Sequence, residues 1–309
     1  MSVHHLHGSP DVLEVRVPVA TMWSTAAAPR ELDRLALLDD PDVPGWAASM
    51  DATVRKALGG RTVTQLLLGE GVHVLEDRGD WVRVAALAQP SSQHPDGYPG
   101  WVRRTHLGTP VPRTDGATAF VMTQAAPCVV EDGTTCALSF GTALWVAGTT
   151  GDTVHVPLPG DRSATVSRSD VRLSAKNEPP CYVPEDILGS ARRFLGMRYL
   201  WGGTSGWGLD CSGLVHLAYR AHGVVVPRDA FDQADDVEPV PLDRVRPGDL
   251  YFFARPGERI YHVGFATRPV GDDGVRWMLH APEGGELIED APMAPHRIAT
   301  LVSAGRVTR

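Results

Sequence analysis

Cys211 is the residue of this chain whose sequence surroundings best suit nucleophilic chemistry. It ends the glycine-rich segment 199–211, and apolar residues recur at helical spacing in 214–218. The spacing predicts a helix from Cys211 through about Ala221, with Gly223 as the stop. Because the amide groups of a first turn and the helix dipole favour a thiolate, we expect a lowered pKa for the Cys211 thiol.

Two histidines downstream are candidate bases for this thiol. His262 lies in the run 260–265 and His280 in the run 275–281, and both runs have the composition of strands. A cysteine on a helix that faces histidines on the following strands is the nucleophile and base arrangement of cysteine peptidases. The alternative interpretation is that Cys211 and both histidines are satisfied core residues.

Six short blocks follow one another along the segment from about Cys181 to Arg309. They are YLWGG at 199–203, LDCSG at 209–213, VPRDAFDQ at 226–233, RPGDL at 246–250, HVG at 262–264 and LHA at 279–281. With these blocks in this order, the segment resembles the NlpC-type family of cell-wall cysteine peptidases. The resemblance implies an α+β chain with a papain-like catalytic domain.

The resemblance assigns a role to each of the three candidate catalytic residues. Cys211 is the implied nucleophile, His262 the general base, and His280 the polar residue that orients the imidazole of His262. The sulfur would attack an amide carbonyl, and a backbone amide at the start of the helix is a natural donor to the oxyanion. His262 would then protonate the leaving amine, while His280 accepts one hydrogen bond and fixes the tautomer of His262.

The amino-terminal half contains a weak internal repeat of strand-like blocks. A Gly-Asp-x-Val-x-Val block occurs at 79–84 and again at 151–156, and alternating blocks follow at 101–107 and 165–171. Short strands between Gly, Asp and Pro turns favour small barrels. The repeated block resembles bacterial SH3-like domains.

Prolines mark the boundaries of this organisation. Residues 110–112 and 178–180 each contain two prolines, which favour extended linkers. We therefore expect two small SH3-like β-barrels followed by the catalytic domain, with the bounds 12–109, 113–175 and 181–309.

The first barrel is expected to carry a helical insertion, since 30–38 and 50–58 have helix-like apolar spacing. Such an elaborated domain resembles a subgroup of the NlpC-type family that acts in cell-wall recycling. The blocks at 65–72 and 96–101 carry this narrower resemblance. It implies hydrolysis of the bond between γ-D-glutamate and a diamino acid, in peptides that begin with a free L-alanine.

The narrower resemblance also implies which residues bind this substrate. An acidic and phenolic cluster can pair with the ammonium group of a free N-terminus and select against an acylated or sugar-linked peptide. The alternative for Glu70 is an ordinary exposed turn acid, and for Tyr98 a core aromatic residue. The narrower resemblance implies that Glu70 and Tyr98, joined by Asp210 and Asp229, bind the free amino terminus. The NlpC-type resemblance implies that Asp210 and Ser212 touch the substrate and that Tyr199 and Trp201 line the pocket.

The charge and cysteine content of the chain limit the classes of binding partner and cofactor that we expect. The 309 residues carry a net charge of −8 and no basic run, which disfavours nucleic acid and anionic membranes as partners. The expected partner is a small cell-wall peptide, L-alanyl-γ-D-glutamyl-diamino acid. The four cysteines show no zinc spacing, so neither a metal nor another cofactor is expected, while a Cys128 to Cys136 bridge stays open.

The N-terminal residues lack a Lys- or Arg-led segment followed by an uninterrupted apolar run. No segment approaches the ~20 apolar residues of a membrane span. We therefore expect a cytoplasmic protein. The histidines His4, His5 and His7 suggest either a metal site or a flexible tail, and the tail is the simpler interpretation.

Three other functions stay open from the sequence alone. One is hydrolysis of intact, cross-linked cell wall, with SH3-like domains that bind the wall, although no export signal is visible. A second is non-catalytic binding of wall peptides, although Cys211, His262 and His280 are all retained. A third is transfer of the acyl group of a thioester intermediate to an amine or alcohol instead of water.

Overall fold

The computed structural model describes residues 12–112, 116–176, 178, 183–271, 273–283 and 286–308. These residues form two compact units. The first unit takes its residues from Met1–Ser49 and Gly60–Pro179, and the second from Met50–Gly59 and Pro180–Arg309. Residues 113 and 181, where two predicted domains begin, lie outside the described residues, as do His4, His5 and His7.

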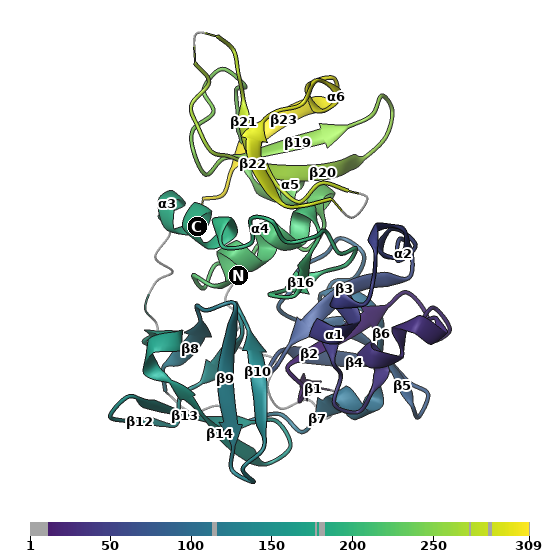
Figure 1. Ribbon diagram of the computed structural model, residues 1–309, viewed down its shortest axis with the longest axis vertical. Helices are drawn as coiled ribbons and strands as arrows, with labels where there is room; N and C mark the ends of the chain where they lie inside the picture. Colours follow the sequence, from purple (N-terminus) through teal and green to yellow (C-terminus); the bar gives the residue numbers. More distant parts are fainter. Residues whose placement is uncertain are drawn as a thin grey trace. The chain divides into compact units, whose positions relative to one another are not determined.

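The first unit begins with a seven-stranded antiparallel sheet in the order β3-β2-β6-β5-β4-β1-β7 (Figure 1). Its strands are β1 (Val12–Val15), β2 (Val19–Trp23), β3 (Thr62–Leu67), β4 (Gly71–Asp77), β5 (Trp81–Ala86), β6 (Tyr98–Arg103) and β7 (Leu107–Gly108). The predicted strand at 79–84 corresponds to β5, and the block at 101–107 continues β6 into the 3-10 helix η2 (Arg104–His106). Apolar side chains such as Met22 and Val82 form one buried cluster.

Two smaller antiparallel sheets complete the first unit, in the orders β10-β9-β14-β13-β12 and β11-β8-β15. Their elements are β8 (Thr118–Val121), β9 (Ala125–Val130), β10 (Thr135–Ser139), β11 (Ala143–Trp145), β12 (Gly148–Thr150), β13 (Thr153–Leu158), β14 (Arg162–Ser167), η3 (Arg168–Asp170) and β15 (Val171–Ser174). Val121, Val154 and Val166 belong to a second buried cluster. Each of the two strand-rich regions therefore packs around its own hydrophobic cluster.

The helical insertion lies between β2 and β3. The spacing predicts helices over 30–38 and 50–58, and the structure has the 3-10 helix η1 (Glu31–Leu37) and the short helix α2 (Ala52–Lys56) at these places. A further helix between them, α1 (Val43–Ala48), was not predicted.

Helix α2 belongs to the second unit, although the sequence places it inside the first predicted domain. The physical reason is Arg55, whose buried guanidinium donates hydrogen bonds to the carbonyl oxygens of Met50 and Tyr199, at 3.2 and 3.1 Å. Because a buried charge without such partners is costly, these bonds hold the segment beside residue 199. Helix α2 thus packs with the second unit, and the predicted domain bounds stay predictions.

The second unit contains a six-stranded antiparallel sheet in the order β18-β23-β19-β20-β21-β22 (Figure 1). Helices α4 and α5 pack against β20, and α3 packs against α4. The elements are α3 (Pro184–Arg192), β16 (Thr204–Ser205), β17 (Gly208–Leu209), α4 (Cys211–Arg220), α5 (Ala230–Asp236), β18 (Glu238–Val240), β19 (Leu250–Ala254), β20 (Ile260–Ala266), β21 (Trp277–His280), β22 (Glu289–Pro292), α6 (Pro295–Ile298) and β23 (Leu301–Arg306). Strands and helices in one chain confirm the predicted α+β class. In the described ranges, no helix has the length and apolar character that crossing a membrane requires.

Candidate active site

Helix α4 begins at Cys211, as the sequence predicts, and Ala221 is its C-terminal cap. Asp210 is the N-cap: its side chain accepts a hydrogen bond from the Gly213 amide at 2.7 Å. Gly223, the predicted stop, has a φ of +78°, a left-handed conformation that favours glycine. The cysteine therefore occupies the first turn of a capped helix.

The glycine-rich segment lets backbone pass close to the start of α4. A Cβ atom at Gly213 would lie 2.1 Å from the carbonyl oxygen of Gly203, and one at Gly203 would lie 2.4 Å from that of Gly208. A side chain at Gly213 would force the loop away from the helix, and one at Gly203 would force two parts of the loop itself apart. The glycines thus position the chain around Cys211.

Arg228 forms a buried ion pair with Asp210. Its Nη2 and Nη1 atoms lie 2.6 and 3.0 Å from the two carboxylate oxygens, and the arginine side chain is only 1% exposed. Arg228 also donates to the hydroxyl of Ser212, at 2.9 Å. The paired charges fix both neighbours of Cys211. Arg228 lies in the block at 226–233, but the sequence interpretation assigned it no role.

The Cys211 side chain is buried between α4 and β20. Its sulfur lies within reach of the backbone amides of Val263 and Ser212, which favour the thiolate. Burial and the nearby Asp210 charge outweigh these amides and raise the thiol pKa to about 12. The lowered pKa expected from the sequence is therefore wrong for this resting site, because the helix start is shielded from water.

The two histidines contact each other on neighbouring strands. Nε2 of His262, on β20, lies 2.8 Å from Nδ1 of His280, on β21. Burial lowers the pKa of His262 well below 6.5 and that of His280 to about 3, and the positive charge of Arg297 acts in the same direction. Both imidazoles are therefore neutral. In the described part of the chain, Nδ1 of His262 is buried and has no hydrogen-bond partner.

The structure also brings Tyr199 and Ser212 to the surroundings of Cys211. Tyr199 is buried, and this burial raises its pKa well above 10. Ser212 is held by the Asp210 and Arg228 pair. Trp201 is 42% exposed, and Asp229 is the residue that precedes α5. All four stand in the second unit with the catalytic candidates, and their predicted contacts with substrate stay predictions.

Glu70 and Tyr98 lie in the first unit. The Glu70 carboxylate is buried and accepts hydrogen bonds from the Leu67 amide at 2.9 Å and from the Gln89 side chain at 3.2 Å. Glu70 is therefore not an ordinary exposed turn acid. Tyr98 packs in the first hydrophobic cluster, as the core alternative expects. Their roles in substrate binding stay predictions.

Cys128 and Cys136 face each other on β9 and β10. Both thiols are free, so the bridge that the sequence left open is absent from this structure. Among the described residues, no group of three or more His, Cys, Asp or Glu side chains is arranged to hold a metal ion.

Comparison with known proteins agrees with this geometry. Residues 196–306 match the NlpC/P60 family, and residues 54–107 match a bacterial dipeptidyl-peptidase SH3 domain. The chain is 35% identical over 277 residues to a γ-D-glutamyl-L-lysine dipeptidyl-peptidase of Bacillus subtilis, which covers 88% of this chain and 90% of the relative. A protein of the same name from Bacillus cereus is 29% identical over 290 residues, covering 90% of this chain and 85% of that relative.

Solved structures support the same assignment. The crystal structure of an NlpC/P60 family protein from Bacillus cereus superposes with a TM-score of 0.88 at 28% identity and covers 96% of this chain and 99% of that protein. A relative at 35% identity along nearly its whole length shows the family. The chain belongs to the NlpC/P60 family and is a cysteine peptidase of that family.

Proposed function

We propose that this cysteine peptidase hydrolyses the γ-D-glutamyl to diamino acid bond of cell-wall peptides that carry a free N-terminal L-alanine. The observation that carries the proposal is the buried thiol and histidine pair in a chain so similar to a γ-D-glutamyl-L-lysine dipeptidyl-peptidase. A small soluble peptide as substrate further suggests a place in cell-wall recycling, in the cytoplasm.

The first chemical step starts from neutral groups. The thiol of Cys211 is protonated and the imidazole of His262 is neutral, because burial disfavours both charged forms. As the sulfur bonds to the γ-carbonyl carbon, the thiol proton passes to Nδ1 of His262 and the carbonyl oxygen becomes an oxyanion. Backbone amides at the start of α4 are suited to stabilise that oxyanion.

The second step releases the two products in turn. The imidazolium of His262 gives its proton to the nitrogen of the diamino acid, the carbon to nitrogen bond breaks, and a thioester with Cys211 remains. Water then attacks the thioester while His262 accepts its proton. The freed L-alanyl-D-glutamate leaves, and His262 returns its proton to the Cys211 sulfur.

Recognition of the free amine is assigned to Glu70 and Tyr98 of the first unit and to Asp229 and Asp210 of the second unit. Among these acids, Asp210 already forms an ion pair with Arg228, so its charge is largely neutralised. Glu70→Gln, which keeps the size of the side chain, should raise KM for the free-amine peptide and leave kcat nearly unchanged.

The test is mass-spectrometric product analysis with L-alanyl-γ-D-glutamyl-L-lysine, its meso-diaminopimelate counterpart and the N-acetylated form of each. Cleavage of the free-amine peptides only, abolished in Cys211→Ala, supports the proposal. Equal cleavage of the acetylated forms contradicts amine recognition. Release of peptides from intact wall would favour a wall hydrolase, and amide products with added amines would favour acyl transfer. Cell fractionation tests the cytoplasmic location.

A further inference from the structure

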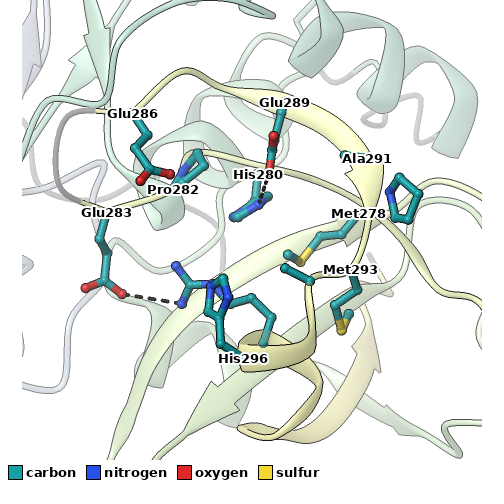
Figure 2. Close-up of a pocket in the computed structure, with 12 residues that line it drawn as sticks. Met278, His280, Pro282, Glu283, Glu286, Glu289, Ala291, Met293 and His296 are labelled. Carbon is teal, nitrogen blue, oxygen red and sulfur yellow. Dashed lines mark hydrogen bonds and ion pairs between the residues drawn. The ribbon is translucent and has the colours of Figure 1, made fainter.

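A pocket of about 150 Å³ lies beside His280 in the second unit (Figure 2). Three carboxylates line it: Glu283, Glu286 and Glu289. His280 points into this pocket, and a dashed contact joins it to Glu289 in Figure 2. The mechanism above makes no use of any of these carboxylates.

Strand pairing places Glu289 opposite His280. The two residues are directly paired between the antiparallel strands β21 and β22, so their side chains lie on the same face of the sheet. Glu289 Oε1 lies 3.4 Å from Nε2 of His280, a distance at the long end for a hydrogen bond. The Glu289 side chain is 55% exposed, so water solvates part of its carboxylate.

This contact determines where the protons of both histidines lie. A carboxylate can only accept a hydrogen bond, so Nε2 of His280 must be the donor. A neutral imidazole carries one N–H, which leaves Nδ1 of His280 as an acceptor. That acceptor lies 2.8 Å from Nε2 of His262, which must therefore donate. Nδ1 of His262 is left without a proton, and it is the buried nitrogen without a partner among the described residues.

We propose that Glu289 is a positioning residue for the peptidase reaction: through His280 it keeps His262 in the tautomer whose Nδ1 can accept the Cys211 proton. The expected effect of Glu289 on turnover rests on the proposed function. Its effect on the histidine tautomers rests on the geometry alone. In the opposite tautomer, His262 Nδ1 would carry a proton and could not act as the base for Cys211.

The other two carboxylates of the pocket do not offer this contact. Glu283 lies 3.5 Å from Arg297, with which it forms an ion pair. Glu286 contributes its backbone carbonyl to the Tyr199 amide, at 2.8 Å, and its side chain is exposed. Glu286→Ala is therefore a matched control, because it removes one carboxylate from the same pocket without touching the His280 contact.

The experiment compares wild-type protein with Glu289→Ala, Glu289→Gln and Glu286→Ala. Nitrogen-15 NMR of histidine-labelled full-length protein reports which imidazole nitrogen carries the proton. Steady-state kinetics on L-alanyl-γ-D-glutamyl-L-lysine report kcat and KM. Because the Glu289→Gln variant keeps an oxygen acceptor in its side-chain amide, it separates the hydrogen bond from the negative charge.

We expect His280 to be the Nε2–H tautomer in wild type, Glu289→Gln and Glu286→Ala, and a mixture in Glu289→Ala. In Glu289→Ala, kcat should fall about three- to tenfold, the size of one partly solvated hydrogen bond, with KM unchanged. A wild-type tautomer and kcat in Glu289→Ala would overturn the proposal. If wild-type protein cleaves no peptide, the proposed function fails, while the NMR result still decides the role of Glu289.

Discussion

Replacing Arg228 with Met should destabilise the start of α4 severely. The methionine is similar in length but leaves the Asp210 carboxylate without its cation, in a place where the arginine side chain is 1% and the aspartate side chain 11% exposed. Removing one partner of a buried ion pair costs about 3–5 kcal/mol. At ~1.4 kcal/mol per tenfold change, opening of α4 should become about two to nearly four orders of magnitude more frequent.

Hydrogen exchange of the peptides that cover α4, read by mass spectrometry, measures this opening within the second unit alone. Exchange of β9 and β10 in the first unit is the internal control. Asp210→Asn combined with Arg228→Met should recover at least ~2 kcal/mol of the loss, because neither charge then stays unpaired and Asn still caps the helix. If hydrogen exchange of α4 is less than tenfold faster in Arg228→Met than in wild type, or if the double variant recovers none of the lost stability, the reasoning is refuted.

Two further predictions concern titratable groups away from the reaction. Burial lowers the pKa of His216 to about 3, so as pH falls from 6.5 towards 3 the unfolded chain takes up a proton that the folded chain does not, and stability falls. His216→Asn can keep the hydrogen bond to the Val226 carbonyl. In calorimetry, the free energy of unfolding of the second unit should then depend less steeply on pH than in wild type, by about 1.4 kcal/mol per pH unit. Equal slopes in variant and wild type would contradict this. Cys128 and Cys136 are directly opposed, a placement compatible with a disulfide. The oxidant diamide should therefore reduce the number of titratable thiols in the denatured protein from four to two. An unchanged number, or loss of the effect when a cysteine other than these two is replaced, would speak against the pairing.

Much of the catalytic candidate set could be predicted from the sequence because it depends on local signals. Glycines and helical apolar spacing predict the helix at Cys211, and strand-like runs hold His262 and His280. Each of these patterns spans only a few residues, so it can be recognised in the sequence without knowledge of the fold. The six sequence blocks predict the contact between the two histidines only through the family resemblance that they carry. The structure shows the distance and the atoms of this contact.

The features that the sequence did not predict depend on contacts between distant residues. The ion pair of Arg228 and Asp210 joins residues 18 apart, and the assignment of α2 to the second unit depends on Arg55 reaching Tyr199, 144 residues away. The direction of the Cys211 pKa shift depends on burial, which no local pattern reports. Glu289 likewise acquires its place only through the pairing of β21 with β22.

The central claim is that Cys211 attacks the γ-glutamyl carbonyl with His262 as its base. Acid quench during turnover of L-alanyl-γ-D-glutamyl-L-lysine, followed by peptide mass spectrometry, tests it most directly. The account predicts an L-alanyl-γ-glutamyl thioester on the peptide that contains Cys211 in wild-type protein, strongly reduced in His262→Ala and absent in Cys211→Ala. Undiminished turnover in Cys211→Ala, or an acyl group on another residue, would contradict it.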